Sequence, residues 1–114
     1  MRITMYHNPR CSKSREALQL LQDRGVSPQI VEYLKTPPDA AALRDILARL
    51  GLRPRDLMRT KESVYKELAL AEVEEDDALI RAMVENPILI ERPIVVSGDK
   101  AALGRPPEKV LDVV

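Results

Sequence analysis

The feature that most constrains the fold is a strand–helix–strand pattern within residues 3–34. Residues 3–6 alternate and favour a β-strand, whereas the apolar spacing from Ser12 onward is helical and stops at Gly25. Residues 29–34 then favour a second strand. Because a helical crossover between two strands of one sheet requires them to run in the same direction, this segment predicts a parallel pair.

The middle of the chain predicts helices. Thr36 can cap a helix in which Pro37 takes the first position, and apolar residues at helical spacing continue to Gly51. Residues 54–72 favour short helical turns. A further helix is expected over residues 76–85, where two acidic residues at its start suit the positive end of the helix.

The last part of the chain predicts a hairpin and a final helix. Residues 94–97 favour a short buried strand, residues 98–99 form a Gly-Asp turn signal, and residues 101–103 favour the returning strand. Two prolines at residues 106–107 begin the last helix. Together these elements predict one α/β domain over residues 1–114. Its outline is a thioredoxin-like three-layer sandwich, a mixed β-sheet with an inserted helical segment.

Length and composition exclude several classes of function. The 114 residues fit one domain, and the net charge of +0 with no Trp or Phe argues against nucleic-acid binding. No apolar run approaches ~18 residues and no signal peptide is evident, so we expect a cytoplasmic protein without a membrane span. One cysteine and one histidine can form neither an internal disulfide nor, by themselves, a metal site.

The single cysteine, Cys11, falls between the first strand and the first helix. A helix N-terminus favours a thiolate and binds anions, because it offers unpaired N–H groups and a positive dipole end. Arg10, Lys13 and Arg15 add positive charge, and His7 can lie beside the sulfur. These features predict a reactive thiol in an anion-binding loop, with a buried, inert cysteine as the alternative.

Ser14 and three arginines extend this candidate site. Ser14 completes a C-x-x-S motif, which puts its hydroxyl one turn along the same helix face. Arg92 and Arg105 each precede a proline, which favours an extended backbone, and Arg59 follows an apolar pair. The bond before Pro93 can be cis. Converging guanidinium groups suit a tetrahedral oxyanion, although each arginine is also consistent with a solvated surface position.

Several segments together resemble the ArsC family, the glutaredoxin-linked arsenate reductases. The segment around Cys11 resembles the active-site loop of that family, and the other segments follow in the family's order over nearly the whole chain. More closely, the chain resembles a small bacterial subgroup of the family. The matching segments are residues 6–15, 33–38, 57–59, 65–68, 86–96 and 104–107.

This resemblance implies reduction of arsenate to arsenite. Cys11 matches the nucleophile, His7 the histidine that assists its ionisation, Ser14 the serine near the thiolate and Pro93 the family's cis-proline. The arginines that hold the oxyanion and the arsenic intermediate are matched by Arg59, Arg92 and Arg105. Glutathione is the implied co-substrate and glutaredoxin the implied partner, with no bound cofactor or metal. The single cysteine agrees, because the electrons must then come from an external thiol.

The chain departs from the best-known members at Arg10, Ser12 and Lys13, where those members carry small uncharged residues. The added basic side chains should strengthen anion binding and can change the anion or partner selected.

Two other functions therefore stay open. A partner-binding regulator similar to the Spx proteins typically carries C-x-x-C, whereas this chain has C-x-x-S. A glutathione-linked thiol oxidoreductase would need the cysteine but not the three arginines.

Overall fold

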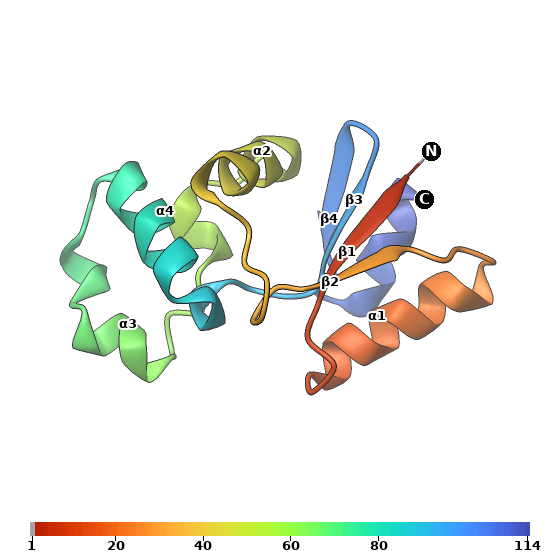
Figure 1. The fold of residues 1–114 in the computed structure, drawn as a ribbon, viewed down its shortest axis with the longest axis horizontal. Helices are drawn as coiled ribbons and strands as arrows, with labels where there is room; N and C mark the ends of the chain where they lie inside the picture. Colours follow the sequence, from red (N-terminus) through yellow and green to blue (C-terminus); the bar gives the residue numbers. More distant parts are fainter. Residues whose placement is uncertain (1) are drawn as a thin grey trace. The chain divides into compact units, whose positions relative to one another are not determined.

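A four-stranded mixed sheet holds the two ends of the chain together (Figure 1). The computed structural model describes residues 2–114. It places the segment up to Thr36 and the segment Arg92–Val114 in one compact unit with the sheet, and Pro37–Glu91 in a second unit. The mixed α/β class expected from the sequence is confirmed. The single-domain organisation stays a prediction.

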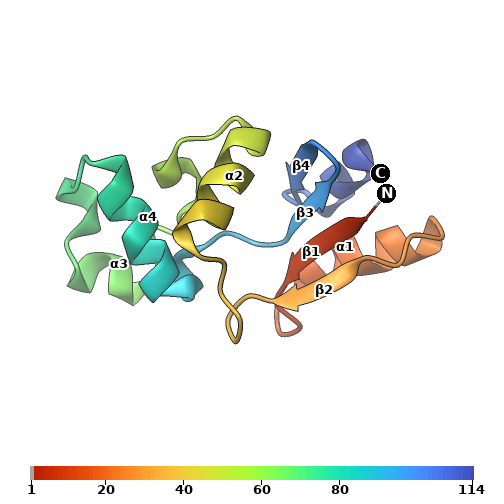
Figure 2. The ribbon, with the colours of Figure 1, turned by 45° about the horizontal axis from the view of Figure 1, so that its top comes forward.

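The strands lie in the order β2-β1-β3-β4, which Figure 2 shows from edge to edge. The parallel pairing of β1 with β2 and the antiparallel hairpin of β3 with β4 confirm the two predicted pairs. The sequence did not predict that β1 also pairs antiparallel with β3, which joins the two distant segments. The strands are β1 Ile3–His7, β2 Gln29–Glu32, β3 Ile94–Ser97 and β4 Lys100–Leu103.

Two helices supply the rest of the core of this unit. They are α1, Ser12–Asp23, and the 3₁₀-helix η4, Pro107–Val113, which contact each other. Met5 and Val95 are partners in the β1–β3 register, and both are fully buried against Leu21 and Val110 from these helices. This core fixes the direction of α1. The first turn of α1 therefore stays at the end of β1.

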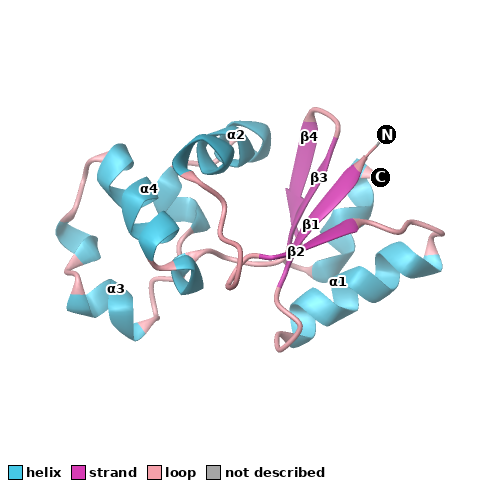
Figure 3. Cartoon of the chain, in the orientation of Figure 1, coloured by secondary structure: helices cyan, strands magenta, loops and turns pink. Residues whose placement is uncertain are grey.

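The second unit is built of helices and loops (Figure 3). The expected short turns between residues 54 and 72 and the helix from residue 76 are confirmed. Gly51 ends the first of these helices with a φ of 68°, as predicted. The elements are α2 Ala40–Leu50, η1 Pro54–Leu57, α3 Ser63–Glu67, η2 Leu70–Glu72, α4 Asp76–Glu85 and η3 Pro87–Leu89.

The expected start of α2 was wrong by several residues. The cap is Asp39, whose carboxylate accepts a hydrogen bond from the N–H of Ala42 at 2.8 Å, so the helix begins at Ala40. Thr36 instead belongs to a turn in which its N–H donates to the carbonyl of Glu32 at 2.9 Å. The same turn ends β2 at Glu32, two residues earlier than predicted. The carbonyl of Glu32 accepts hydrogen bonds from the residues that follow it, so the strand does not continue.

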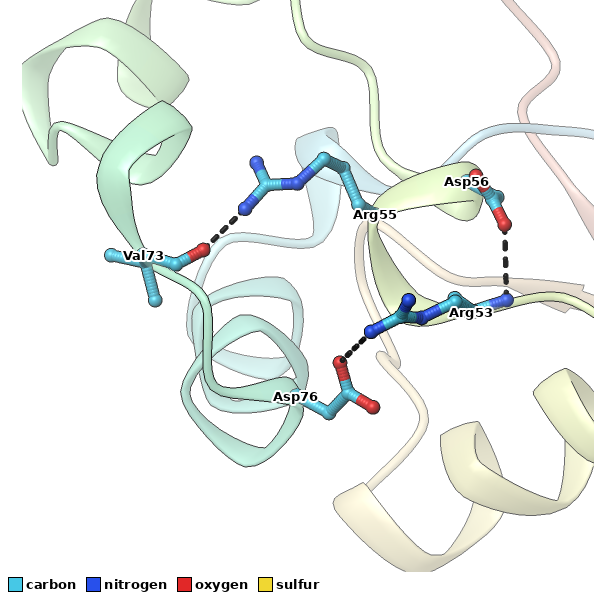
Figure 4. Close-up of polar contacts among 5 residues, drawn as sticks. All are labelled: Arg53, Arg55, Asp56, Val73 and Asp76. Carbon is cyan, nitrogen blue, oxygen red and sulfur yellow. Dashed lines mark hydrogen bonds and ion pairs between the residues drawn. The ribbon is translucent and has the colours of Figure 1, made fainter.

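Arg55, on η1, forms hydrogen bonds to three other segments of the helical unit, and Figure 4 shows the one to Val73. One guanidinium nitrogen donates to the hydroxyl of Tyr65 at 2.5 Å and to the carbonyl of Leu70 at 3.1 Å, and the other donates to the carbonyl of Val73. These acceptors lie on α3, on η2 and just after η2. Hydrogen bonds that involve a charged group are stronger than neutral ones. Arg55 therefore connects these segments of the unit through polar contacts.

We expect Arg55→Ala to lower the free energy of unfolding by about 3 kcal/mol, the upper end of the range for a charge-assisted hydrogen bond. Arg53→Ala is the matched control. The side chain of Arg53 is 80% exposed and lies 3.8 Å from a carboxylate oxygen of Asp76, so its loss should cost less than about 1 kcal/mol. Urea unfolding of the two variants measures the difference. Equal losses would contradict the role assigned to Arg55.

Candidate functional site

Cys11 occupies the N-cap position of α1. Its backbone is extended, with φ −93° and ψ 123°, and its N–H donates to the carbonyl of Asn8 at 3.0 Å. Its own carbonyl accepts the first bond of the helix, from the N–H of Arg15 at 3.0 Å. The side chain is partly buried. The sulfur therefore lies at the positive end of the helix, as the sequence predicted.

The pKa of Cys11 lies below its usual value because several groups favour the thiolate. Burial is the largest single influence and acts in the opposite direction, since it penalises the charged form. The backbone N–H of Ser14, the guanidinium of Arg92 and the backbone N–H of Lys13 together outweigh it. At neutral pH, Cys11 therefore carries more thiolate than an exposed cysteine would, and the thiolate is the nucleophilic form.

Ser14 connects the loop before Cys11 to the helix after it. Its side chain is fully buried, and its hydroxyl oxygen lies 2.6 Å from Nδ1 of His7 in a hydrogen bond. The same oxygen accepts the backbone N–H of Asn8 at 3.1 Å. The side chain of Asn8 accepts the backbone N–H of Arg10 at 3.0 Å. Sequence reasoning missed Asn8, although an Asn-Pro pair is a known signal for such a turn.

His7 contacts Ser14, and its surroundings favour the neutral imidazole. Burial is the main cause that lowers its pKa; the charge of Glu32 raises it and that of Arg15 lowers it. Glu32 lies beside His7 because the two are partners in the β1–β2 register. The Ser14 contact orders the loop around the thiol. That His7 itself assists the ionisation of Cys11 stays a prediction.

Arg92 lies next to the thiol and has an unused donor. It forms a side-chain hydrogen bond with Cys11, yet its Nε is buried without a hydrogen-bond partner among residues 2–114. A buried donor without an acceptor costs about 1–3 kcal/mol. Arg105 lies beside it, because its Nε donates to the backbone carbonyl of Arg92 at 3.2 Å. This part of the site therefore offers hydrogen-bond donors to an anion.

The Arg92–Pro93 peptide bond is cis, as expected for that position, and the Arg105–Pro106 bond is cis as well. Gly104 packs against Pro93, and its N–H donates to the carbonyl of Pro93 at 2.8 Å. A β-carbon at residue 104 would lie only 2.6 Å from Cγ of Pro93, so a side chain there does not fit. The contact keeps the segment that carries Arg105 against the segment that carries Arg92.

Arg59 belongs to the helical unit rather than to the unit of Cys11. Its N–H donates to the carbonyl of Leu89 at 2.7 Å, and its Nε lies 3.7 Å from a carboxylate oxygen of Glu91. Its Nη1 is buried without a hydrogen-bond partner in the described chain. The structure thus brings together Arg92 and Arg105, whereas the convergence of Arg59 with them stays a prediction.

Other features of the structure give weaker evidence for a functional site. A cavity of about 510 Å³ in the helical unit includes Arg53 and Arg55, but both have protein partners there (Figure 4). Within residues 2–114, no cluster of three or more His, Cys, Asp or Glu side chains could hold a metal ion. No helix in that range has the length and apolar character to cross a membrane.

Comparison with known proteins identifies the family. The profile of the ArsC family matches residues 6–113. The chain belongs to the ArsC family. Over 98% of its length it is 60% identical to the Escherichia coli K12 protein YfgD, titled an uncharacterised protein, of which 96% is covered. It is 53% identical over 95% of its length to an arsenate reductase of Neisseria meningitidis, with 94% of that protein covered.

A solved structure gives the same assignment. The arsenate reductase from Vibrio cholerae superposes with a TM-score of 0.96 at 51% identity, over 100% of this chain and 98% of that one. The thioredoxin-like ArsC fold expected from the sequence is therefore confirmed. In this ArsC protein, Arg10, Ser12 and Lys13 are exposed around the nucleophile, so their differences from the best-known members lie on the surface.

We expect the pH profile of Cys11 alkylation by iodoacetamide to have its midpoint below that of a cysteine in an unstructured peptide. Because Arg92 favours the thiolate, Arg92→Ala should move the midpoint upward and slow alkylation at pH 7. Arg24→Ala, an exposed change at the other end of α1, controls for net charge and should leave the midpoint in place. An unmoved midpoint in Arg92→Ala would show that Arg92 does not act on the thiol.

Gly104→Ala should destabilise the protein by about 1–3 kcal/mol, the usual cost of overpacking, because Pro93 must move away from the new methyl group. Asp99→Ala, at the exposed hairpin turn, is the control and should change stability by less than about 0.5 kcal/mol. Thermal or urea unfolding reports the difference. Tolerance of alanine at residue 104 would mean that the Pro93 segment is not held in this contact.

Proposed function

We propose that this protein is an arsenate reductase in which Cys11 is the nucleophile. The observation that carries the proposal is the pairing of a cysteine of lowered pKa with Arg92, whose Nε is buried without an acceptor among the described residues. A tetrahedral oxyanion supplies the missing acceptor and is the kind of substrate that guanidinium groups bind well. Relatives at 53% and 47% identity that carry the name arsenate reductase support the same substrate.

In this proposal, arsenate binds at the first turn of α1. The N–H groups of that turn and the positive end of the helix attract the anion, while Arg92 and Arg105 neutralise its charge. Arg59, which also has a buried nitrogen without an acceptor in residues 2–114, is proposed as a third binding group. Ser14 and His7 are proposed to keep the Cys11 loop in place, since their hydrogen bond connects β1 to α1.

The reaction then uses external thiols, because the chain has one cysteine. The Cys11 thiolate bonds to arsenic, and an arsenate oxygen leaves as water. The sulfur of glutathione next bonds to arsenic, and a second oxygen leaves as water. A thiol of glutaredoxin takes the glutathione sulfur as a disulfide, which leaves its electron pair on arsenic. Arsenic(III) is then released from Cys11 by water as arsenite.

No metal or bound cofactor takes part in these proposed steps. The thiols perform the reduction and the arginines provide the electrostatic stabilisation. Such a reaction requires a reducing compartment in which glutathione is kept reduced, so we also propose a cytoplasmic location. Glutathione and glutaredoxin are the proposed co-substrate and partner.

The test is arsenate-dependent oxidation of NADPH in the presence of glutathione, glutaredoxin and glutathione reductase. We expect activity in the wild-type protein and a loss of at least ~100-fold in Cys11→Ser, because a serine hydroxyl is far less ionised than a thiol. Activity retained in Cys11→Ser would contradict the nucleophile. No activity in a folded wild-type protein with a titratable Cys11 would contradict arsenate as the substrate.

Arg92→Ala separates an arsenate reductase from a general thiol oxidoreductase. Assayed at a pH well above the Cys11 pKa, where the thiol is ionised in both proteins, the variant should lose arsenate reduction by about 10²-fold or more. Its exchange with a small uncharged disulfide should persist under the same conditions. Arsenate reduction that persists in Arg92→Ala would contradict a role of Arg92 in binding the oxyanion and would favour the oxidoreductase alternative.

A further inference from the structure

Arg59 and Glu91 lie beside each other because a short antiparallel contact fixes their backbones. Two backbone hydrogen bonds, one donated by Arg59 at 2.7 Å and one donated by Glu91 at 2.8 Å, flank a bridge between Met58 and Ile90. Both bridge residues are buried. Arg59 follows one of them and Glu91 follows the other, so the two charged side chains are diagonal neighbours on one face of the contact.

The ion pair between these side chains leaves the guanidinium incompletely bonded. Nε of Arg59 lies 3.7 Å from a carboxylate oxygen of Glu91, and the side chains are 25% and 23% exposed. A charge-assisted hydrogen bond would measure about 2.7–2.9 Å. Nη1 of the same guanidinium is buried and has no hydrogen-bond partner among residues 2–114. Glu91 therefore balances the charge of Arg59 without satisfying all of its donors.

An oxyanion at Arg59 would gain one interaction and lose another. It would accept a hydrogen bond from the buried Nη1, which has no acceptor in the described chain. It would also lie near the negative charge of Glu91, and two anions beside one guanidinium repel each other. The repulsion is only partly screened, because both side chains are mostly buried. The carboxylate therefore weakens the attraction of Arg59 for any anion.

The position of Glu91 in the chain also connects it to the thiol. Glu91 directly precedes Arg92, whose guanidinium bonds to Cys11. Successive α-carbons lie about 3.8 Å apart. One carboxylate thus pairs with Arg59 and adjoins in sequence the arginine that contacts the nucleophile.

We propose that Glu91 is the resident counter-ion of Arg59 and limits how tightly the protein holds an oxyanion. It is a positioning residue, since it acts through Arg59. The proposal rests on the proposed function in taking Arg59 as an oxyanion-binding group. In that reaction the substrate is an anion, whereas the product, arsenous acid, is uncharged at neutral pH. The charge of Glu91 destabilises the bound anion and not the uncharged product, so it favours conversion of one into the other.

Sulfate tests this role without any reaction at Cys11, because it is a tetrahedral dianion that a thiol does not reduce. Calorimetric titration of the reduced protein with sulfate gives the Kd. Glu91→Gln keeps the size of the side chain and removes its charge, so we expect a Kd about fivefold lower. Glu85→Gln makes the same charge change at an exposed position on α4 and should leave the Kd unchanged.

Variants of Arg59 show whether Glu91 acts through it. Arg59→Gln should raise the Kd for sulfate at least about tenfold, because a charged donor is lost. Adding Glu91→Gln to this variant should change the Kd by less than about twofold, since the shared guanidinium is absent. Arg59→Lys keeps a positive charge and should keep the response to Glu91→Gln. Urea unfolding verifies that each variant is folded.

The kinetics of arsenate reduction give a second measurement. In the NADPH assay, Glu91→Gln should lower the KM for arsenate about fivefold without raising kcat, because it strengthens binding of the anion and leaves Cys11 unchanged. Loss of a merely structural contact would instead lower kcat/KM.

An unchanged Kd for sulfate in Glu91→Gln would overturn the proposal, and so would an equal gain in the Arg59→Gln background. Absence of sulfate binding in all variants would overturn it as well. The proposed function fails separately. Tighter sulfate binding in Glu91→Gln, without arsenate-dependent activity in any variant, would overturn arsenate as the substrate and support the role of Glu91. Arsenate-dependent activity with an unchanged Kd for sulfate and an unchanged KM in Glu91→Gln would overturn the role of Glu91 alone.

Discussion

The antiparallel pairing of β1 with β3 determines where the chemistry of this protein can occur. Tyr6 and Ile94 are partners in that pairing, so the end of β1 lies beside the start of β3. The loop that leads to Cys11 leaves β1 at this point, and Arg92 precedes β3 at the same point. The thiol and the guanidinium therefore meet although 80 residues of chain separate them. The buried Met5 and Val95, on the same two strands, hold the pairing in place.

The site contains two groups whose burial costs free energy. Burial disfavours the charged form of Cys11, and the buried Nε of Arg92 has no acceptor in the described chain. The second cost falls when an anion binds beside the guanidinium, because the anion accepts hydrogen bonds and its own desolvation is offset by positive charge. The fold is thus arranged for a charged substrate, and the packing of Gly104 on Pro93 supports that arrangement at the rear of the site.

The loop before Cys11 contributes residues to two different surfaces. On its inner side, Asn8 and His7 bond to the buried hydroxyl of Ser14, which ties β1 to α1. On its outer side, the same residues line a cavity together with residues at and after the end of β2. A short, rigid loop suits this arrangement, because a mobile loop would have to be ordered at each step.

Local sequence signals determined much of the fold. Alternation and helical spacing located β1, α1 and the β3–β4 hairpin, and Gly51 ended α2, because each depends on contacts within a few residues. Such signals also identified Cys11 as a thiol at a helix N-terminus. They failed at Thr36, where turn bonds to the carbonyl of Glu32 outcompeted a helix cap and left that role to Asp39.

Only the tertiary structure decided which distant residues share the site. The β1–β3 pairing brought Arg92 to Cys11, and no local pattern encodes a pairing between segments so far apart. The bond of His7 to Ser14 and the cavity beside Glu32 likewise depend on how α1 packs against the sheet. The sequence by itself therefore determined the reactive residue, the elements around it and the family. The three-dimensional packing decided its partners, because hydrogen bonds and charges act over a few ångströms of space regardless of separation along the chain.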